Sequence, residues 1–452
     1  MNIDVSVKLL FEYPTISSLA AVMEDMTPSH QRPSEGQLKP VVRAIPDSPE
    51  PKSRQGNSIY MRVERRPLLS LFAAGKIDLV DAAAVGYLPD ALAEQTGLTR
   101  AEIIHDWYEQ LPTLTNILET FLGRIAIIIL PLFASELYRS RDGVVKALIE
   151  ALEVTGKLGA RTVSLTGLIP SATNYGQALG AAMAAREDLP KITTGHANTA
   201  ATVVLAIKRI LSEAGRDLAQ ERVGFLGLGS IGVTTLRLML RCLPHPKEIV
   251  LCDVYDRRDL LAKIQEEIAS DLGFHGLATV VTSKQSVPTE FYDATLIVGA
   301  TNVPEVIDIG LVRPGTILVD DSAPHCFSVG RTVERFQKHA DILFTEGGAL
   351  QSPHPIHRLR YLPRFVEKKA NPHYLGAVSE HNPFQITGCV LSGLLLSCSQ
   401  ELAPTLGLAD DSSCLKHYEM LCQLGFQAAE LHCRDFVLPE ESVHNFRQRF
   451  GR

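Results

Sequence analysis

Residues 223–232, VGFLGLGSIG, decide the fold of this chain. A short apolar run opens the stretch, and three glycines follow it in G-x-G-x-x-G spacing, at Gly227, Gly229 and Gly232. The sequence VTTLRLML then has the pattern of a helix, and a second apolar run, IVLCD, ends at Asp253, about 20 residues beyond the last glycine. This order of strand, glycine loop, helix, strand and acid predicts a dinucleotide-binding unit.

Each glycine has a physical role in such a unit. Gly227 would allow the tight turn, Gly229 would let a pyrophosphate approach the backbone, and Gly232 would let the helix pack closely on the strand. The helix N-terminus would present unpaired N–H groups and a positive dipole end to the phosphates. The glycines alone are also typical of a βα turn without a ligand, but the flanking elements favour nucleotide binding. The predicted cofactor contacts are Gly227, Gly229, Ser230, Ile231, Gly232, Asp253, Arg257, Arg258, Ala300 and Thr301.

The rest of the chain alternates between strand and helix patterns. Strands are expected at 294–300, 316–321 and 341–348, each followed by a small or polar loop of the kind that lines the ligand edge of a parallel sheet. The predicted fold class is α/β, with a central Rossmann-like, doubly wound parallel sheet, an N-terminal α/β domain and a helical C-terminal region. The predicted domains are an α/β substrate domain at 59–200, the Rossmann domain at 201–350 and the helical region at 351–452.

Two further segments precede these domains. Residues 1–26 have a short helical pattern, and residues 27–58 are rich in proline with few large apolar residues, which predicts a flexible linker. The phrase LFEYPTISSLA (10–20) resembles the last helix of a peptidyl or acyl carrier domain. That resemblance implies a carrier remnant, with the serine of the phosphopantetheine arm upstream of Met1, so the chain is not expected to be a working carrier. An ordinary amphipathic helix is the alternative.

Composition excludes several classes of function. The net charge of −7 and the lack of a long basic run argue against nucleic acid as a partner. The longest apolar run, 125–133, is too short to cross a bilayer, so no transmembrane segment is expected, and the N-terminus lacks the features of a signal peptide. The eight cysteines show no paired C-x-x-C pattern. Disulfides and a metal site are therefore not expected, and a cytoplasmic location is the prediction.

A second constellation surrounds Cys389 in the stretch HNPFQITGCVLSGLLLSCSQEL. Pro383 and Gly388 interrupt regular structure just before it, and an apolar helix follows. A cysteine in the first turn of a helix has its thiolate stabilised by the helix dipole and by unpaired N–H groups, which makes it nucleophilic. This pattern makes Cys389 a candidate nucleophile. The alternative is a structural role, because a buried cysteine is also a common small core residue.

From about residue 123 to residue 433 the order of these elements resembles the long-chain acyl-[acyl-carrier-protein] reductases of the cyanobacterial type. The matching phrases are TTGHANTA (193–200), DLAQERVGFLGLGSIG (217–232), KEIVLCDVYDRRDLL (247–261), LFTEGGAL (343–350) and TGCVLSGLLL (387–396). The resemblance implies reduction of a carrier-bound acyl thioester to an aldehyde. It also implies that Cys389 attacks the thioester, with an acyl carrier protein or peptidyl carrier domain as partner.

Thioester reduction needs further groups, for which the sequence offers several candidates. Negative charge on the carbonyl oxygen needs a donor, and His196, Asn198 and His381 are the candidates. The family usually has a basic residue at the position of Val254, which favours NADPH, whereas Asp253 favours NADH. Arg257 and Arg258 could still bind the 2′-phosphate of NADPH, so the sequence does not decide between NADPH and NADH as the cofactor.

Two other functions remain as alternatives. The long helix before the nucleotide fold also resembles the shikimate dehydrogenase and glutamyl-tRNA reductase group, which predicts an NAD(P)-dependent dehydrogenase of a small polar substrate. A cysteine after the nucleotide fold has no role in that chemistry. The second alternative is a non-catalytic nucleotide-binding docking module of a biosynthetic assembly.

Overall fold

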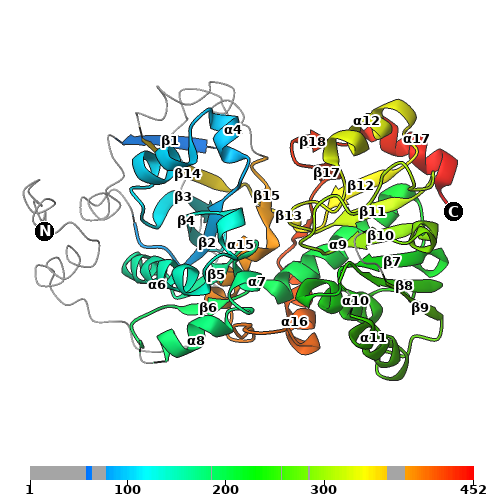
Figure 1. Cartoon of the computed structure of the whole chain (residues 1–452), viewed down its shortest axis with the longest axis horizontal. Helices are drawn as coiled ribbons and strands as arrows, with labels where there is room; N and C mark the ends of the chain where they lie inside the picture. Colours follow the sequence, from blue (N-terminus) through cyan, green and yellow to red (C-terminus); the bar gives the residue numbers. More distant parts are fainter. Residues whose placement is uncertain (1–57, 64–77, 185, 256, 283–285, 364–381) are drawn as a thin grey trace, which may run out of the picture. The chain divides into compact units, whose positions relative to one another are not determined.

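The computed structural model describes residues 58–63, 78–184, 186–255, 257–282, 286–363 and 382–452 (Figure 1). The predicted carrier remnant at 1–26, all but the last residue of the predicted linker at 27–58, and His381 lie outside the described residues. In the described parts of the chain, no helix has the length and apolar content needed to cross a membrane.

The chain divides into two compact units, each assembled from separate stretches of sequence. Unit 1 contains the described residues up to Thr193, those within His354–Pro383, and Ser392–Pro404. Unit 2 contains Thr194–Pro353, Phe384–Leu391 and Thr405–Arg452. The predicted segments follow one another along the chain, whereas the residues after 350 are shared between both units.

Unit 1 is built on a seven-stranded mixed sheet in the order β1-β14-β3-β4-β2-β5-β6. Its strands are β1 (Ser58–Val63), β2 (Ala82–Leu88), β3 (Thr113–Thr120), β4 (Gly123–Phe133), β5 (Thr162–Leu165), β6 (Lys191–Thr193) and β14 (His357–Pro363). The apolar run at 125–133 forms most of β4, which pairs with β3 in antiparallel and β2 in parallel orientation. Helix α6 (Arg141–Lys157) buries Val144, Leu148 and Leu152 in the core beside the sheet.

Shorter helices complete unit 1. They are α4 (Leu92–Thr96), α5 (Arg100–Glu102), α7 (Ile169–Ala172) and α8 (Gln177–Met183), with a π-helical turn at Ile103–Trp107. The hydroxyl oxygen of Ser140 accepts a hydrogen bond from the N–H of Gly143 and so caps α6.

Unit 2 is a Rossmann fold. Its six strands are β7 (Arg222–Leu226), β8 (Glu248–Asp253), β9 (Leu277–Thr282), β10 (Leu296–Gly299), β11 (Ile317–Asp320) and β12 (Leu343–Glu346). They run in the order β12-β11-β10-β7-β8-β9, and every neighbouring pair is parallel. Read from β9, this is the 3-2-1-4-5-6 order of a doubly wound sheet, which confirms the predicted fold class.

The helices of unit 2 are α9 (His196–Ala214), α10 (Ser230–Cys242), α11 (Arg258–Ser270), α12 (Val329–His339), the start of α15 (Gly388–Cys398), α16 (Asp411–Gln423) and α17 (Glu440–Phe450). Small antiparallel pairings join β13 (Ala349–Gln351) to β15 (Gln385–Thr387) and β16 (Gln427–Ala428), and β17 (His432–Cys433) to β18 (Phe436–Val437). Residues 351–452 therefore contribute strands as well as helices.

Helix α9 is the central support of unit 2. Fifteen of its nineteen residues are buried, so the helix is covered on nearly all sides rather than on a single stripe. It packs against α10, α16 and α17 and against strands β11 and β12 (Figure 1). A helix held in this way gives its N-terminal residues fixed positions, and those residues belong to the TTGHANTA phrase.

Candidate active site

The glycine loop between β7 and α10 has the backbone that a dinucleotide site requires. Gly227 has a φ of +86°, a left-handed conformation, and a Cβ there would lie 2.6 Å from the carbonyl oxygen of Ala300. A Cβ on Gly232 would clash with the carbonyl oxygen of Gly227. At Gly229, by contrast, no described atom lies within 4 Å of the Cβ position. The backbone is thus closely packed around Gly227 and Gly232, whereas the space beside Gly229 is free of other described atoms.

Helix α10 begins at Ser230, directly after Gly229, which precedes the helix with extended backbone. The first N–H groups of α10 therefore face the loop, where they have no partner within the helix. Ile231 lies in the first turn, and its carbonyl oxygen accepts a hydrogen bond from the hydroxyl of Thr234 at 3.1 Å. This end of the helix can hold an anion such as a pyrophosphate.

Asp253 ends β8 and is 1% exposed. Its Oδ2 atom accepts a hydrogen bond from the N–H of Leu228 at 3.1 Å, and its Oδ1 atom accepts one from the N–H of Tyr255 at 3.0 Å. The carboxylate thus joins the glycine loop to the loop after β8. Each oxygen has a second lone pair in addition, which a ribose hydroxyl could use.

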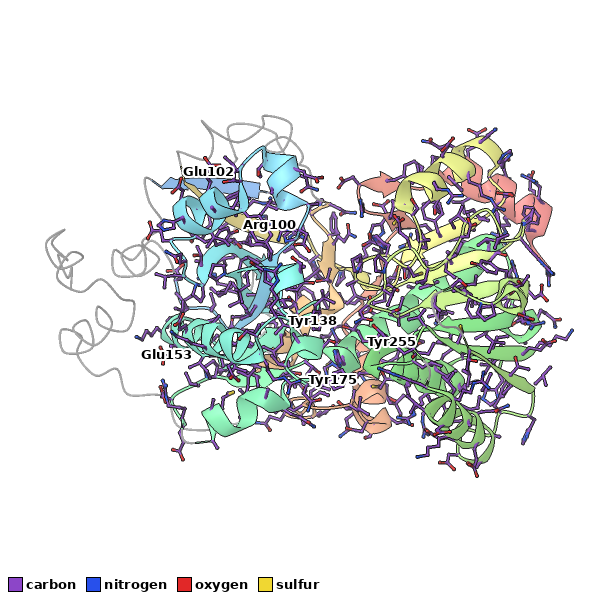
Figure 2. The ribbon with its side chains drawn as sticks, in the orientation of Figure 1. Arg100, Glu102, Tyr138, Glu153, Tyr175 and Tyr255 are labelled. Carbon is purple, nitrogen blue, oxygen red and sulfur yellow. The ribbon has the colours of Figure 1, made fainter. Side chains whose placement is uncertain are left out.

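The loop after β8 carries the predicted basic residues. The guanidinium of Arg257 lies 3.9 Å from Asp253 Oδ2 and 5.2 Å from the centre of the Tyr255 ring. Tyr255, labelled in Figure 2, is exposed, and its hydroxyl donates to Asn302 Oδ1 at 3.2 Å. Arg258 is the first residue of α11. Arg257 and Asp253 are close enough that a ligand phosphate here would meet both charges.

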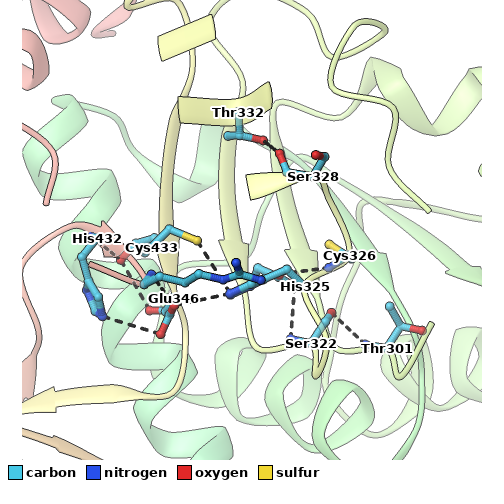
Figure 3. A network of polar contacts seen from close by, with 12 residues as sticks. Thr301, Ser322, His325, Cys326, Ser328, Thr332, Glu346, His432 and Cys433 are labelled. Atoms are coloured by element: carbon cyan, nitrogen blue, oxygen red, sulfur yellow. Dashed lines mark hydrogen bonds and ion pairs between the residues drawn. The ribbon is translucent and has the colours of Figure 1, made fainter. Parts of the chain in front are cut away.

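The end of β10 closes the other side of the loop. The N–H of Ala300 donates to the carbonyl oxygen of Leu226 at 2.8 Å. Thr301 is buried, and its N–H donates to the hydroxyl of Ser322 at 3.0 Å (Figure 3). The two predicted contacts from this strand therefore border Gly227, at the carboxyl edge of the sheet between β7 and β10 where the strand order reverses.

Cys389 is in contact with Gly195, the residue that directly precedes α9. Gly195 has a φ of +71°, and a Cβ on it would lie 3.2 Å from the Cα of Cys389 and 3.3 Å from its carbonyl oxygen. A Cβ on Gly388 would likewise clash with the hydroxyl of Thr202 in α9. Glycine at 195 and 388 thus lets the start of α15 touch the start of α9. These residues all belong to unit 2.

Asn198 fixes the peptide that precedes Cys389. Its Nδ2 atom donates to the carbonyl oxygen of Gly388 at 2.8 Å, and its Oδ1 atom lies 3.2 Å from Nδ1 of His417. Burial lowers the pKa of His417 to about 4, so the ring is neutral at pH 7 and its Nδ1–H is the donor. Asn198 is a predicted candidate hydrogen-bond donor to the oxyanion. One N–H of its side-chain amide is therefore already used to hold the Gly388 peptide in position.

His196 joins α9 to the glycine loop. Its Nδ1 atom lies 2.9 Å from the hydroxyl oxygen of Ser230. The side chain is buried, and burial lowers the pKa of the imidazole to about 4. His196 is therefore neutral at physiological pH, where it can accept or donate one hydrogen bond through each ring nitrogen but carries no charge.

The thiol of Cys389 is partly exposed and lies 3.6 Å from the hydroxyl oxygen of Thr387, to which it donates. Burial raises the pKa of six other thiols, those of Cys242, Cys252, Cys326, Cys398, Cys414 and Cys433. A buried thiol with a raised pKa is a poor nucleophile because little thiolate is present. This leaves Cys389 and the exposed Cys422 of α16, and the position of Cys389 at the start of α15, beside Gly195, favours Cys389.

Sequence reasoning missed His417, Thr387 and Thr202, which support Cys389. They are ordinary residues of helices and strands, and His417 lies 219 positions from its partner Asn198. The LFTEGGAL and TGCVLSGLLL phrases do meet, because the N–H of Gly388 donates to the carbonyl oxygen of Gly348 at 2.9 Å. These two phrases are thus in contact through Gly348 and Gly388 of unit 2, although nothing in their spacing predicts that contact.

The sequence matches no protein-family model and no curated protein. Among solved structures, it is similar to L-tryptophan dehydrogenase from Nostoc punctiforme, with 13% identity, 82% of this chain and 88% of that chain covered, and a TM-score of 0.33. It is also similar to shikimate 5-dehydrogenase from Listeria monocytogenes in complex with shikimate and NAD, with 14% identity, 59% and 86% covered, and a TM-score of 0.29.

A third similar structure is Δ1-pyrroline-2-carboxylate reductase from Thermococcus litoralis in complex with NADH and L-proline. Identity is 13%, 51% of this chain and 67% of that chain are covered, and the TM-score is 0.25.

Proposed function

We propose that this protein reduces a carrier-bound acyl thioester to an aldehyde, with Cys389 as the nucleophile and NADPH or NADH as the hydride source. One observation carries the proposal. Two consecutive residues, Gly195 and His196, contact Cys389 and the first residue of the glycine-loop helix respectively. A nucleophile and a dinucleotide loop are thereby held by the same end of one buried helix, and together they are the groups that thioester reduction requires.

The glycine loop fits a dinucleotide on geometric grounds. The open space at Gly229 leaves room for a pyrophosphate, and the tight contacts at Gly227 and Gly232 hold α10 close to the sheet. The residues that would hold the cofactor are the loop with Ser230 and Ile231, the ends of β8 and β10, and the Arg257–Arg258 pair. A bound reduced nicotinamide would supply the hydride that the protein's own side chains lack.

The first step is acyl transfer. The thiolate of Cys389 attacks the carbonyl carbon of the carrier thioester, and the carrier's thiolate leaves and takes up a proton. Cys389 is the second residue of α15, where the positive end of the helix dipole would stabilise the thiolate before attack. The hydrogen bond from Asn198 to the Gly388 carbonyl keeps this turn in place while the acyl group is attached.

The second step is reduction of the acyl-enzyme. A bound reduced nicotinamide would supply a hydride to the carbonyl carbon, and the hemithioacetal then left on Cys389 would collapse to an aldehyde and the free thiolate. In total, one thioester, one reduced nicotinamide and one proton give the aldehyde, the carrier thiol and the oxidised nicotinamide. His196 is neutral at pH 7, so its contribution is positioning through Ser230 and hydrogen bonding rather than charge. His381 remains a further candidate donor.

The partner in this proposal is an acyl carrier protein or a peptidyl carrier domain, as the resemblance of the matched phrases implies. The eight cysteines are all free in the structure, which fits a reducing compartment such as the cytoplasm.

The proposal is tested by intact-mass analysis after incubation of the protein with an acyl-pantetheine thioester and no cofactor. We expect one acyl adduct, which peptide mapping places on Cys389, and its release as aldehyde when NADPH or NADH is added. Cys389→Ala should form no adduct, whereas Cys422→Ala, at an exposed cysteine of α16, should behave as the parent protein.

Two results would favour the alternatives. A small-substrate dehydrogenase would form no adduct and would keep its activity in Cys389→Ser. A docking module would bind the nicotinamide nucleotide but would neither form the adduct nor turn over either class of substrate.

A further inference from the structure

A cluster of metal-ligating side chains lies at the carboxyl ends of β11 and β12 in unit 2, outside the residues used above. His325, Glu346 and Cys433 each direct one ligand atom toward the others, and these atoms all lie within 4.8 Å of one another. They come from the loop after β11, from the end of β12 and from β17. Figure 3 shows the three side chains converging, with dashed lines from His325 toward Glu346 and Cys433.

Two of the three ligand–ligand separations are close to the edges of a tetrahedral zinc site. His325 Nε2 lies 3.4 Å from Glu346 Oε1 and 3.8 Å from Cys433 Sγ. Zinc bonds of about 2.0–2.3 Å at tetrahedral angles place ligand atoms about 3.3–3.7 Å apart. The third separation, between Glu346 and Cys433, is at most 4.8 Å, so one ion among the three atoms could reach all of them after small side-chain adjustments.

Neighbouring groups orient two of the ligands. Asp320 Oδ2 lies 3.0 Å from Nδ1 of His325, so the carboxylate holds the ring with Nε2 directed into the cluster. A carboxylate bonded to the far nitrogen of a metal-bound histidine is a recurrent feature of zinc sites. The N–H of Arg434 donates to Glu346 Oε1 at 2.7 Å and fixes that carboxylate as well.

His432 lies beside the cluster but is not one of the ligands. Its Nδ1 atom is 2.7 Å from the carbonyl oxygen of Glu430, so this nitrogen carries the hydrogen. Its Nε2 atom accepts from the Gln385 amide at 2.8 Å. Both ring nitrogens are thus engaged, and three ligands from the described residues leave a fourth position for water or another oxygen.

Charge and ligand chemistry select the metal. A thiolate and a carboxylate together balance the two charges of Zn²⁺, and a sulfur–nitrogen–oxygen set is disfavoured by Mg²⁺ and Ca²⁺, which take oxygen ligands. Cys433 is 1% exposed, whereas the side chains of Glu346 and His325 are 30% and 16% exposed, so an ion can enter from their side.

We propose that His325, Glu346 and Cys433 bind one zinc ion. The competing state is a metal-free ion pair network. Without a cation, burial lowers the pKa of His325, but hydrogen bonds to Asp320, Cys433 and Glu346 outweigh burial and raise it to about 12, so the ring would be an imidazolium. The two states differ in whether zinc is taken up with a thiolate ligand, and that difference can be measured without any assay of activity.

The experiment uses the full chain, reduced, stripped with a chelator and then titrated with Zn²⁺ by calorimetry and with Co²⁺ by absorption. We expect about one ion per chain, a thiolate-to-cobalt charge-transfer band, and a higher melting temperature with zinc. Cys433→Ser should lose the band, and Asp320→Asn should weaken zinc binding by about 10–100-fold. Cys422→Ser, at an exposed cysteine of α16, is the matched control and should keep both signals.

Two outcomes overturn the proposal: stripped parent protein that takes up no zinc, or a charge-transfer band that persists in Cys433→Ser. Circular dichroism shows whether Cys433→Ser folds. If it does not, the proposal is judged by the cobalt band of the parent and by the zinc affinity of Asp320→Asn. An unchanged affinity in Asp320→Asn would then count against the site. These readouts do not depend on thioester reduction, so failure here leaves the proposed function untouched.

Discussion

The Nδ1 atom of His196 lies 2.9 Å from the Oγ atom of Ser230, so the first residue of α9 is bonded to the first residue of α10. The residue before it, Gly195, touches Cys389. Two sites that the sequence presents as separate, the glycine motif and the cysteine motif, therefore share the N-terminus of one buried helix. A change at that point should affect acyl transfer and cofactor binding by different routes.

Gly195→Ala should slow acylation of Cys389 by ten-fold or more, since the new methyl group would lie 3.2 Å from the Cα of Cys389. The left-handed backbone at this position should also reduce the free energy of unfolding by about 1–2 kcal/mol. Acylation is measured by stopped-time mass analysis with an acyl-pantetheine thioester, and stability by urea unfolding.

Gly215→Ala is the matched control, because Gly215 caps the other end of α9 with a φ of +64° and the atoms nearest its new methyl group belong to the flexible side chain of Arg447. It should lose similar stability and keep the acylation rate. If both variants acylate equally fast, the contact between Gly195 and Cys389 has no role in chemistry.

Gly229→Val should abolish binding of NADPH and NADH while leaving the fold and the acylation of Cys389 intact. The backbone at Gly229, with φ −75°, tolerates a side chain, and no described atom lies within 4 Å of its Cβ position. The valine would thus extend from an open Cβ position into the space proposed for the pyrophosphate. Fluorescence titration and intact mass measure the two properties.

Gly330→Val serves as the control, since Gly330 of α12 is likewise open around its Cβ position. Nucleotide affinity in Gly229→Val equal to that of Gly330→Val would mean that the glycine loop does not bind the cofactor.

Stability should fall in acid because His417 is buried without charge. Burial lowers its pKa from 6.5 to about 4. The unfolded chain therefore binds a proton below about pH 6.5 that the folded chain refuses until about pH 4, and the free energy of unfolding decreases over this window, by an amount on the order of 3 kcal/mol. His196 acts in the same direction.

The measurement is urea unfolding of the parent and of His417→Gln at several pH values within that window. The variant should show a shallower decrease, whereas His275→Gln, at an exposed histidine, should follow the parent. Parallel curves for the parent and His417→Gln would contradict the assignment.

The Rossmann unit was predictable because its signals are local. The strand, glycine loop, helix and acid of residues 223–253 lie within one supersecondary unit, and the glycines have steric reasons to occupy their positions. The expected strands at 294–300, 316–321 and 341–348 contain β10, β11 and β12. Each is a short apolar run buried in a parallel sheet, a pattern that is visible without knowledge of its partners.

The environment of Cys389 was not predictable to the same degree. Asn198 bonds to Gly388 across 190 positions and to His417 across 219, and no periodicity encodes either contact. The same holds for His325, Glu346 and Cys433, whose spacing along the chain matches no metal-binding motif. They come together because the ends of β11, β12 and β17 lie side by side. Strand β14 similarly enters the sheet of unit 1 from residues far along the chain.

Under the proposed function, the choice between NADPH and NADH would depend on the balance between Asp253 and Arg257. The carboxylate lies at the end of β8, where a ribose hydroxyl would be accepted and a 2′-phosphate repelled. The Arg257 guanidinium, 3.9 Å away and partly exposed, would attract that phosphate instead. Because Asp253 also accepts the N–H of Leu228, its removal should loosen the glycine loop and weaken both cofactors. The ratio of the two affinities is therefore the informative quantity.

Asp253→Ala should shift the ratio of dissociation constants toward NADPH by about ten-fold, equivalent to about 1.4 kcal/mol, since a repulsion between two negative charges in a partly desolvated pocket is removed. Arg257→Ala should shift it toward NADH. Paired titrations of the purified variants with both nucleotides provide the ratio. Asp259→Ala removes an exposed carboxylate in the first turn of α11 and controls for net charge, so its ratio should equal that of the parent. If neither Asp253→Ala nor Arg257→Ala changes the ratio, the carboxylate serves only to fasten the loop through Leu228 and Tyr255.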